Sequence, residues 1–272
     1  MRKLFLSIGA FSALIAVSLM LMGASPATYK DGIYFIQGDD FEKGSGWKDL
    51  VTIEVKAGQI VKAEWDGVNS EVPVFKPAWV KAGKYVMKKD GVSWAEQAEK
   101  VTSYLVKTQD PSKMKFSDAE GHTDAIAGVS IHVKPFFVLA QKALAAGPTP
   151  RGAYKDGIYH AEAADFDAKS GWKGTIDVLV KHGYIVNACW NALAKDGTDK
   201  FAAIKAGKYV MKDKGVPWNA QARDTVRYLL KSQDPTKIVY KDVTGLTDAI
   251  TGVSIHVKEF FELAKEALKK AK

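Results

Sequence analysis

The sequence repeats itself. Tyr29–Tyr34 returns unchanged as Tyr154–Tyr159, and Thr123–Leu144 returns as Thr247–Leu268 with 17 of 22 residues identical. The copies are 125 residues apart early in the chain and 124 apart later. That period is far longer than the roughly 20–50 residues of a solenoid unit. We therefore expect two tandem domains.

The two expected domains are residues 28–146 and 153–272. The segment between them, 147–152, is rich in Pro and Gly and lacks large apolar side chains, which is typical of a semi-rigid linker. Each copy has roughly 120 residues, enough to bury a core of its own.

Each copy begins with strands and ends with helices. Val51, Ile53 and Val55 alternate with polar residues before an Ala57-Gly58 turn, which predicts a hairpin. Ser93 to Glu96 fits a capping box at a helix start. A last helix is predicted up to Leu144, and the same order recurs in the second copy. We expect an α+β fold in which an antiparallel sheet is packed with helices.

Residues 1–27 have the pattern of a secretory signal peptide. Arg2 and Lys3 precede an uncharged apolar stretch, and Ser25-Pro26-Ala27 offers small residues for cleavage. The stretch is long enough that a retained N-terminal membrane anchor is the alternative. Either way the protein is expected to be exported, to the periplasm or the outer face of the cytoplasmic membrane.

Charge and cysteine content exclude several classes of function. Without Arg2 and Lys3 the chain has 37 basic and 31 acidic residues, a net charge of +6, and the lysines form no dense run. We expect a solvated surface and no nucleic-acid binding. Cys189 is the single cysteine and lies among apolar residues, so we expect a buried thiol and neither a disulfide nor a cysteine metal cluster.

One loop stands out as a candidate site in each copy. It contains two residues that suit a phosphate, a glycine and, two positions later, a serine expected at the start of the last helix. A turn and a helix cap would account for the same pattern. The candidate cofactor-binding residues are Thr123, Asp124, Gly128, Ser130 and His132 in the first copy, and Thr247, Asp248, Gly252, Ser254 and His256 in the second.

The loop resembles the Asp-x-x-(Ser/Thr)-Gly-Ala-(Thr/Ser) signature of the FMN-binding domain family. Family members include subunits of sodium-pumping and electron-bifurcating respiratory complexes and bacterial surface proteins with tandem flavin domains. The Asp-Gly-Ile-Tyr, Gly-Trp-Lys, Lys-Tyr-Val-Met and Gln-Asp-Pro segments occur in the order of the small stand-alone members. The resemblance covers nearly all of residues 28–270.

The resemblance implies that FMN phosphate is held at, or esterified to, Ser130 and Ser254. It makes Asp124 and Asp248 the signature acids and implies a separate flavin transferase that acts outside the cytoplasm. Val129 and Val253 stand where the family usually has alanine, and a valine there would narrow the space beside each serine. Noncovalent FMN is the alternative to an ester.

Several further residues have two interpretations. His132 and His256 could pair with phosphate or pack at a helix start, and no second His or Cys stands at ligand spacing, so no metal site is predicted. Tyr85, Met87 and their counterparts Tyr209 and Met211, and likewise Trp47 and Trp172, could line a flavin pocket or the core.

The leading hypothesis is an exported electron carrier with two flavins, served by redox partner proteins of the envelope, rather than an enzyme with turnover of its own. The alternative is a cell-envelope binding or structural module that has the fold without the cofactor. A third hypothesis is an exported binder of another planar ligand such as haem. No hydrolase triad, Walker loop or dinucleotide fingerprint is visible in the sequence.

Overall fold

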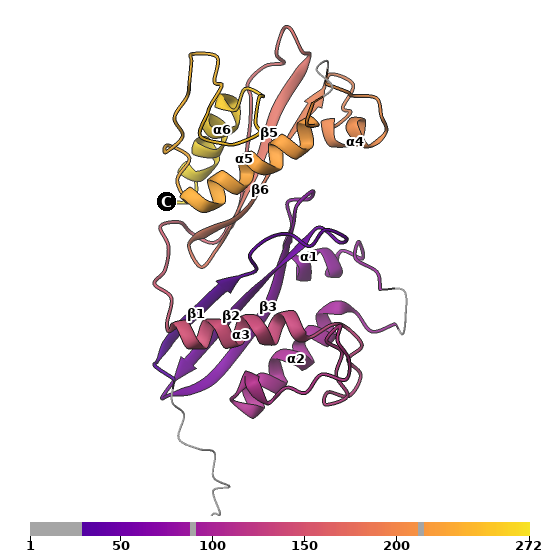
Figure 1. Ribbon diagram of the computed structural model, residues 1–272, viewed down its shortest axis with the longest axis vertical. Helices are drawn as coiled ribbons and strands as arrows, with labels where there is room; N and C mark the ends of the chain where they lie inside the picture. Colours follow the sequence, from indigo (N-terminus) through magenta and orange to yellow (C-terminus); the bar gives the residue numbers. More distant parts are fainter. Residues whose placement is uncertain (1–28, 88–90, 212–214) are drawn as a thin grey trace, which may run out of the picture.

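A computed structural model describes residues 29–87, 91–211 and 215–272. The expected signal peptide, residues 1–27, lies outside the described residues. Within the described part, the chain forms two α+β units, each with a three-stranded antiparallel sheet and helices packed on it (Figure 1), as the sequence predicts. None of the helices in these ranges is both long and apolar enough to cross a membrane.

The first repeat is a meander followed by helices. Its strands are β1 (Gly32–Gln37), β2 (Trp47–Lys56) and β3 (Gln59–Asn69), hydrogen-bonded in the order β1-β2-β3. The helices are α1 (Lys76–Lys81), α2 (Trp94–Thr108), the short 3-10 turn η1 (Pro111–Lys113) and α3 (Lys134–Ala146).

The second repeat has the same order. Its sheet contains β4 (Gly157–Glu162), β5 (Trp172–Lys181) and β6 (Tyr184–Ala194), hydrogen-bonded in the order β4-β5-β6. The helices are α4 (Lys200–Lys205), α5 (Trp218–Ser232) and α6 (Lys258–Lys269).

The β2–β3 hairpin forms because its turn has the right chemistry. Ala57 and Gly58 both adopt positive φ, at 50° and 72°. The Asp31 carboxylate accepts hydrogen bonds from both of their amides, at 2.9 and 2.7 Å. Positive φ at both central residues matches the twist of a two-residue hairpin. The alternation of β2 then turns Val51, Ile53 and Val55 toward the helices, and Leu50 toward the opposite face.

The long helix of each repeat is tied to the sheet at its C-terminal end. Gln109 ends α2 in the left-handed region with φ of 62°. Its side-chain amide accepts from the Ile60 amide at 2.7 Å and donates to the Ile60 carbonyl at 2.8 Å. Gln233 makes the same two bonds to Ile185. At the other end, α2 has the predicted capping box at Ser93, and Pro217 caps α5 without a side-chain bond.

The two sheets meet through the faces that their helices leave uncovered. Phe35, Leu50 and Val68 of the first repeat form one apolar cluster with Leu179 and Val186 of the second. All five are less than 9% exposed. Burial of this apolar area favours association of the repeats. Each sheet is therefore covered on one face by its own helices and on the other by its neighbour.

Candidate functional site

The serine loop of the first repeat is fixed by a buried glutamine from α2. Gln97 is 1% exposed. Its side-chain oxygen accepts from the Ser130 amide at 2.7 Å and the Ile131 amide at 3.2 Å. Ile126 and Ile131 are buried on either side of the serine. The loop is thus a rigid shelf. Ser130 is exposed on it, and its hydroxyl donates to the same Gln97 oxygen at 3.4 Å.

The second repeat builds the same shelf. The Gln221 oxygen accepts from the Ser254 amide at 2.6 Å and the Ile255 amide at 3.2 Å. Ser254 is exposed like Ser130. Gly128 and Gly252 have φ of 70° and 77°, the left-handed region that glycine adopts most readily.

The expectation that the serines begin the last helix is wrong. The helices α3 and α6 begin at Lys134 and Lys258, four residues later. The Gly121 carbonyl accepts from the Val133 and Lys134 amides, at 2.8 and 3.3 Å, so these amides at the helix start already have partners. The Ser130 amide is not part of a helix start. It donates instead to the side chain of Gln97, 33 residues earlier in the chain.

The other candidate residues of the loop divide into structural and exposed ones. Thr123 is buried, and its hydroxyl donates to the Lys115 carbonyl at 2.7 Å and accepts from the Ala125 amide at 3.1 Å. Thr247 makes the matching bonds. Asp124, Asp248, His132 and His256 are exposed.

The valines beside the serines lie partly inward. Val129 and Val253 are half-buried, and each packs against the core cluster of its own repeat. The side chain that was expected to narrow the space beside the hydroxyl is directed in part toward the core. Both serines remain exposed, each with its hydroxyl donating to the glutamine below it at 3.3–3.4 Å.

Whether these residues fit an FMN phosphate depends on the mode of attachment. A noncovalent phosphate needs free amide donors, and the amides at positions 130, 131, 254 and 255 already donate to glutamine. An ester needs only the exposed hydroxyl. In the first repeat the Lys100 ammonium lies 3.4 Å from the Gly128 carbonyl oxygen, where it could neutralise an ester phosphate.

An open depression lies beside the first shelf. It has a volume of about 700 Å³ and is lined by Ala125, Ile126 and Ala127 of the loop and by Tyr104 and Lys107 of α2, among others. Small apolar groups next to a tyrosine suit the face of a planar ring system. The residues present therefore fit an esterified FMN in the first repeat.

Sequence reasoning missed a buried lysine in each repeat. Lys76, at the start of α1, is 7% exposed, and its ammonium lies 4.3 to 5.2 Å from the ring centroids of Trp47, Tyr85 and Trp94. Lys200 is 8% exposed and lies 4.4 to 5.4 Å from Trp172, Tyr209 and Trp218. We call each set a lysine cage. The sequence could have revealed these cages, because the same lysine and the same three aromatic residues occur at corresponding positions of both copies.

Burial and nearby acids act in opposite directions on the caged lysines. Burial lowers the pKa of Lys76 to about 8, although Asp49 and Glu42 favour its charged form. Burial likewise lowers the pKa of Lys200 to about 8, against the effect of Glu259. Cation–π contact stabilises the ammonium in each cage.

The aromatic residues considered as flavin contacts therefore have another role. Trp47, Trp172, Tyr85 and Tyr209 are walls of the lysine cages. The Met87 and Met211 sulfurs lie 3.6 and 3.7 Å from the side-chain nitrogens of the loop-holding glutamines. The methionines thus support the serine shelves from behind.

A cavity of about 590 Å³ lies between the repeats. Ser45 and Asn69 line it from the first repeat, and Trp190, Phe201 and Arg223 from the second. The Asn187 side chain at its edge donates to the Asn69 carbonyl at 2.7 Å. Cys189 is buried nearby, and burial raises the pKa of its thiol, as expected of an inert core cysteine.

Comparison with known proteins gives partial matches. No family model matches the chain, and no curated protein matches it. A solution NMR structure of a Clostridium thermocellum protein is 49% identical, covers 43% of this chain and 91% of its own, and has a TM-score of 0.36. A crystal structure of a Clostridium perfringens protein is 23% identical, covers 44% of this chain and 88% of its own, and has a TM-score of 0.33.

Proposed function

We propose that this protein is an exported electron carrier with one FMN site per repeat, and that the FMN phosphate is esterified to Ser130 and Ser254. One observation carries the proposal. Both repeats present an exposed serine on a shelf whose neighbouring amides are already satisfied by a buried glutamine. Such a serine suits covalent modification from outside better than noncovalent phosphate binding.

The residues around each serine position the hydroxyl for its modification. Gln97 and Gln221 fix the backbone at the serine, so little conformational entropy remains to be lost when the ester forms. Lys100 would compensate the phosphate charge in the first repeat, whereas the second has Asp224 at that position, paired with Arg227 at 2.6 Å. When bound, the flavin supplies the redox chemistry.

The proposal requires partners outside the chain. A flavin transferase would form the ester, and the expected export signal agrees with its action outside the cytoplasm. Envelope redox proteins would then deliver and remove electrons. The two repeats pack against each other through their sheets, so both flavins would be carried on one body.

The test is expression with and without a flavin transferase, followed by acid denaturation, absorbance spectra and intact mass. We expect two adducts, each with the mass of FMN less one water. Ser130→Ala and Ser254→Ala should each remove one adduct. Ser117→Ala, at an exposed serine that does not line the depression, is the control. Colour lost on denaturation would instead show noncovalent FMN. Colourless protein of unmodified mass would overturn the proposal and favour an envelope module without cofactor.

A further inference from the structure

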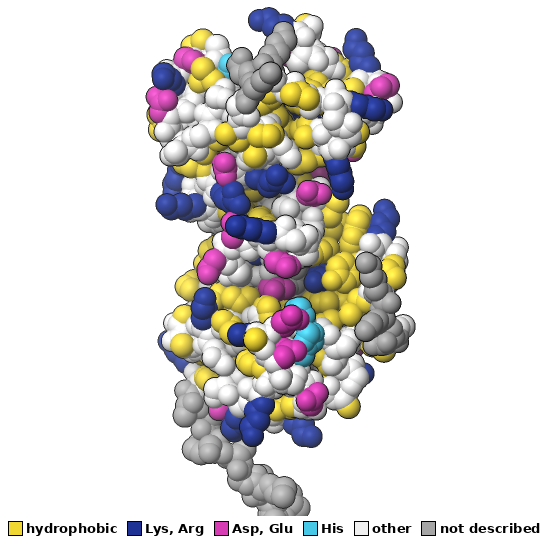
Figure 2. Space-filling view, turned by 45° about the vertical axis from the view of Figure 1, so that its right-hand side comes forward, with side chains coloured by type: hydrophobic (Ala, Val, Ile, Leu, Met, Phe, Trp, Pro, Cys, Tyr) yellow, Lys and Arg dark blue, Asp and Glu magenta, His cyan; other side chains and the backbone are white. Residues whose placement is uncertain are grey.

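Two histidines that are ten residues apart in sequence meet on the surface of the first repeat. The rings of His122 and His132 have centroids 4.3 Å apart and are nearly perpendicular, at 83°. The His132 Nε2 lies 3.5 Å from a carboxylate oxygen of Glu120. Figure 2 shows histidine and acidic side chains gathered on the lower domain.

The backbone brings these side chains together without help from a ligand. The Val133 amide donates to the Gly121 carbonyl at 2.8 Å, so the residues flanking that bond, His122 and His132, must be neighbours. Gly121 has φ of 96°, and a Cβ there would lie 2.3 Å from the Cβ of Lys134. The close approach of the turn to the helix start therefore depends on glycine.

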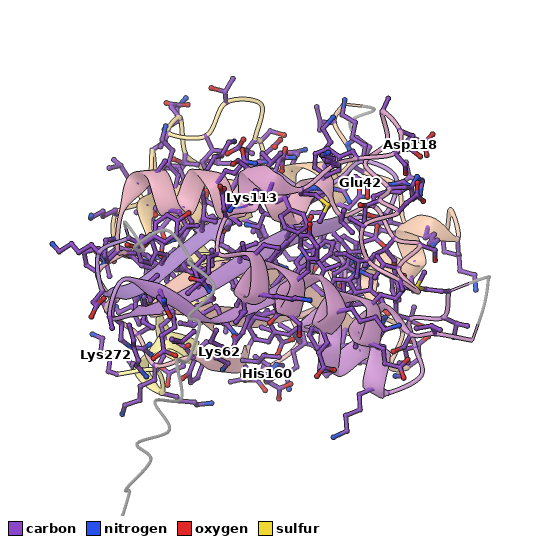
Figure 3. The ribbon with its side chains drawn as sticks, turned by 90° about the horizontal axis from the view of Figure 1, so that it is seen from below. Glu42, Lys62, Lys113, Asp118, His160 and Lys272 are labelled. Carbon is purple, nitrogen blue, oxygen red and sulfur yellow. The ribbon has the colours of Figure 1, made fainter. Side chains whose placement is uncertain are left out.

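Asp118 orients one of the two imidazoles. It lies at the periphery of the molecule (Figure 3), and its carboxylate pairs with the Nδ1 of His122. The same carboxylate accepts from the Gly121 amide at 2.8 Å and the His122 amide at 3.0 Å, which fixes its own position. In the neutral imidazole, a proton held at Nδ1 by a carboxylate leaves Nε2 as the lone-pair donor that a metal ion binds.

We propose that Glu120, His122 and His132 form a binding site for a divalent transition-metal ion, with Zn²⁺ as the reference ion. One ligand atom from each residue lies within 4.8 Å of the others. Tetrahedral Zn²⁺ needs donors about 3.3 Å apart, which small side-chain rotations can reach. Two imidazoles and one carboxylate, with a position left for water or another ligand, are a donor set that suits this ion.

The second repeat supplies a natural control. Asp242 holds the corresponding turn, because its carboxylate oxygen accepts from the Thr244 and Gly245 amides at 2.9 and 3.1 Å. His256 is present, but Thr244 and Leu246 stand where the first repeat has Glu120 and His122. The turn is thus present in both repeats, whereas the full donor set is present in the first. We infer a metal site at this turn of the first repeat and none at the matching turn of the second.

The test is calorimetric titration of the flavin-free protein with Zn²⁺. We expect one saturable site. His122→Leu and Glu120→Thr, which place the second repeat's residues in the first, should each weaken binding about tenfold or more. His160→Ala, at an exposed histidine beside Asp177 and Glu162, should leave binding unchanged. Equal affinity of wild type and His122→Leu, or no saturable binding, would overturn the site.

The reverse exchange tests whether the three ligands suffice. Thr244→Glu together with Leu246→His rebuilds the donor set in the second repeat beside His256. The stoichiometry should rise from one Zn²⁺ to two. A stoichiometry that stays at one would refute the assignment of these three residues as the site. Because Zn²⁺ is titrated into protein that carries no flavin, the result is independent of the proposed electron-transfer role.

Discussion

The caged lysines give the sharpest test of how this fold balances burial against charge. We consider the replacement of Lys76 by methionine, which has a similar length and no charge. Lys76 is 7% exposed, and burial lowers its pKa from 10.5 to about 8. At 1.36 kcal/mol per unit, this difference opposes folding by roughly 3 kcal/mol when the lysine is charged.

The sign of the pH dependence follows from which state binds more protons. Between pH 8 and 10.5 the folded protein has lost the proton from Lys76, and the unfolded chain still holds it. The free energy of unfolding therefore rises with pH in this window. From pH 7 to 9.5 the lysine should add about 2 kcal/mol to stability. Lys76→Met removes this term, so wild type should gain about 2 kcal/mol relative to the variant over that range.

The assay is urea denaturation followed by far-ultraviolet circular dichroism at several pH values, for wild type and Lys76→Met. Taking the difference cancels the other titrating groups, provided they are independent of the site. Lys84→Met, which removes an exposed ammonium 5.0 Å above Trp79, is the matched control. A difference that is flat from pH 7 to 9.5 would refute the reasoning. It would mean that the three rings and the acids stabilise the ammonium as much as burial opposes it.

Other predictions follow from single contacts. Gln97→Leu leaves the Ser130 and Ile131 amides without their acceptor, so it should lower the free energy of unfolding by about 2 kcal/mol and speed hydrogen exchange at both amides. Unchanged exchange would contradict the role of Gln97 in fixing the loop. Leu179→Ala, at 0% exposure between the sheets, should cost about 2–5 kcal/mol and separate the unfolding of the two repeats in calorimetry, which a single sharp transition would disprove. Gly174→Ala places a Cβ 2.3 Å from the Glu259 carboxylate, so it should destabilise the protein by about 1–2 kcal/mol, and less in a Glu259→Ala background; equal losses would argue against the contact.

Local patterns in the sequence were sufficient to predict the order of strands and helices in each repeat. The hairpin turn at Ala57-Gly58 and the capping box at Ser93 are confirmed because their determinants lie within a few residues. The strand after this turn, β3, continues to Asn69, and its last residues pair with the start of β2 at Trp47. Local alternation does not encode that contact.

The candidate site was predictable only in part, because long-range partners decide its geometry. Ser130 has the local appearance of a helix cap, yet Gln97, on another helix, takes its amide. The separation of His122 and His132 by ten residues gave no reason to pair them, and the Gly121–Val133 backbone bond does so. Spacing rules for metal ligands cover continuous turns and helices, whereas this donor set spans the whole serine loop.

In both lysine cages a carboxylate favours the charged form of the lysine, but the carboxylate comes from a different element in each repeat. In the first repeat Asp49 of β2 is the acid with the largest effect on Lys76, and Pro135 of α3 stands at the position that corresponds to Glu259. In the second, β5 has Gly174 where β2 has Asp49, and Glu259 of α6 occupies the space that the glycine leaves. Because a Cβ at 174 would contact the Glu259 carboxylate, the two positions are sterically coupled. Each cage thus has an acid near its lysine, although the acid lies on a strand in one repeat and on a helix in the other. A nearby carboxylate stabilises a charged lysine, so we conclude that each cage holds an ammonium ion and not a neutral amine.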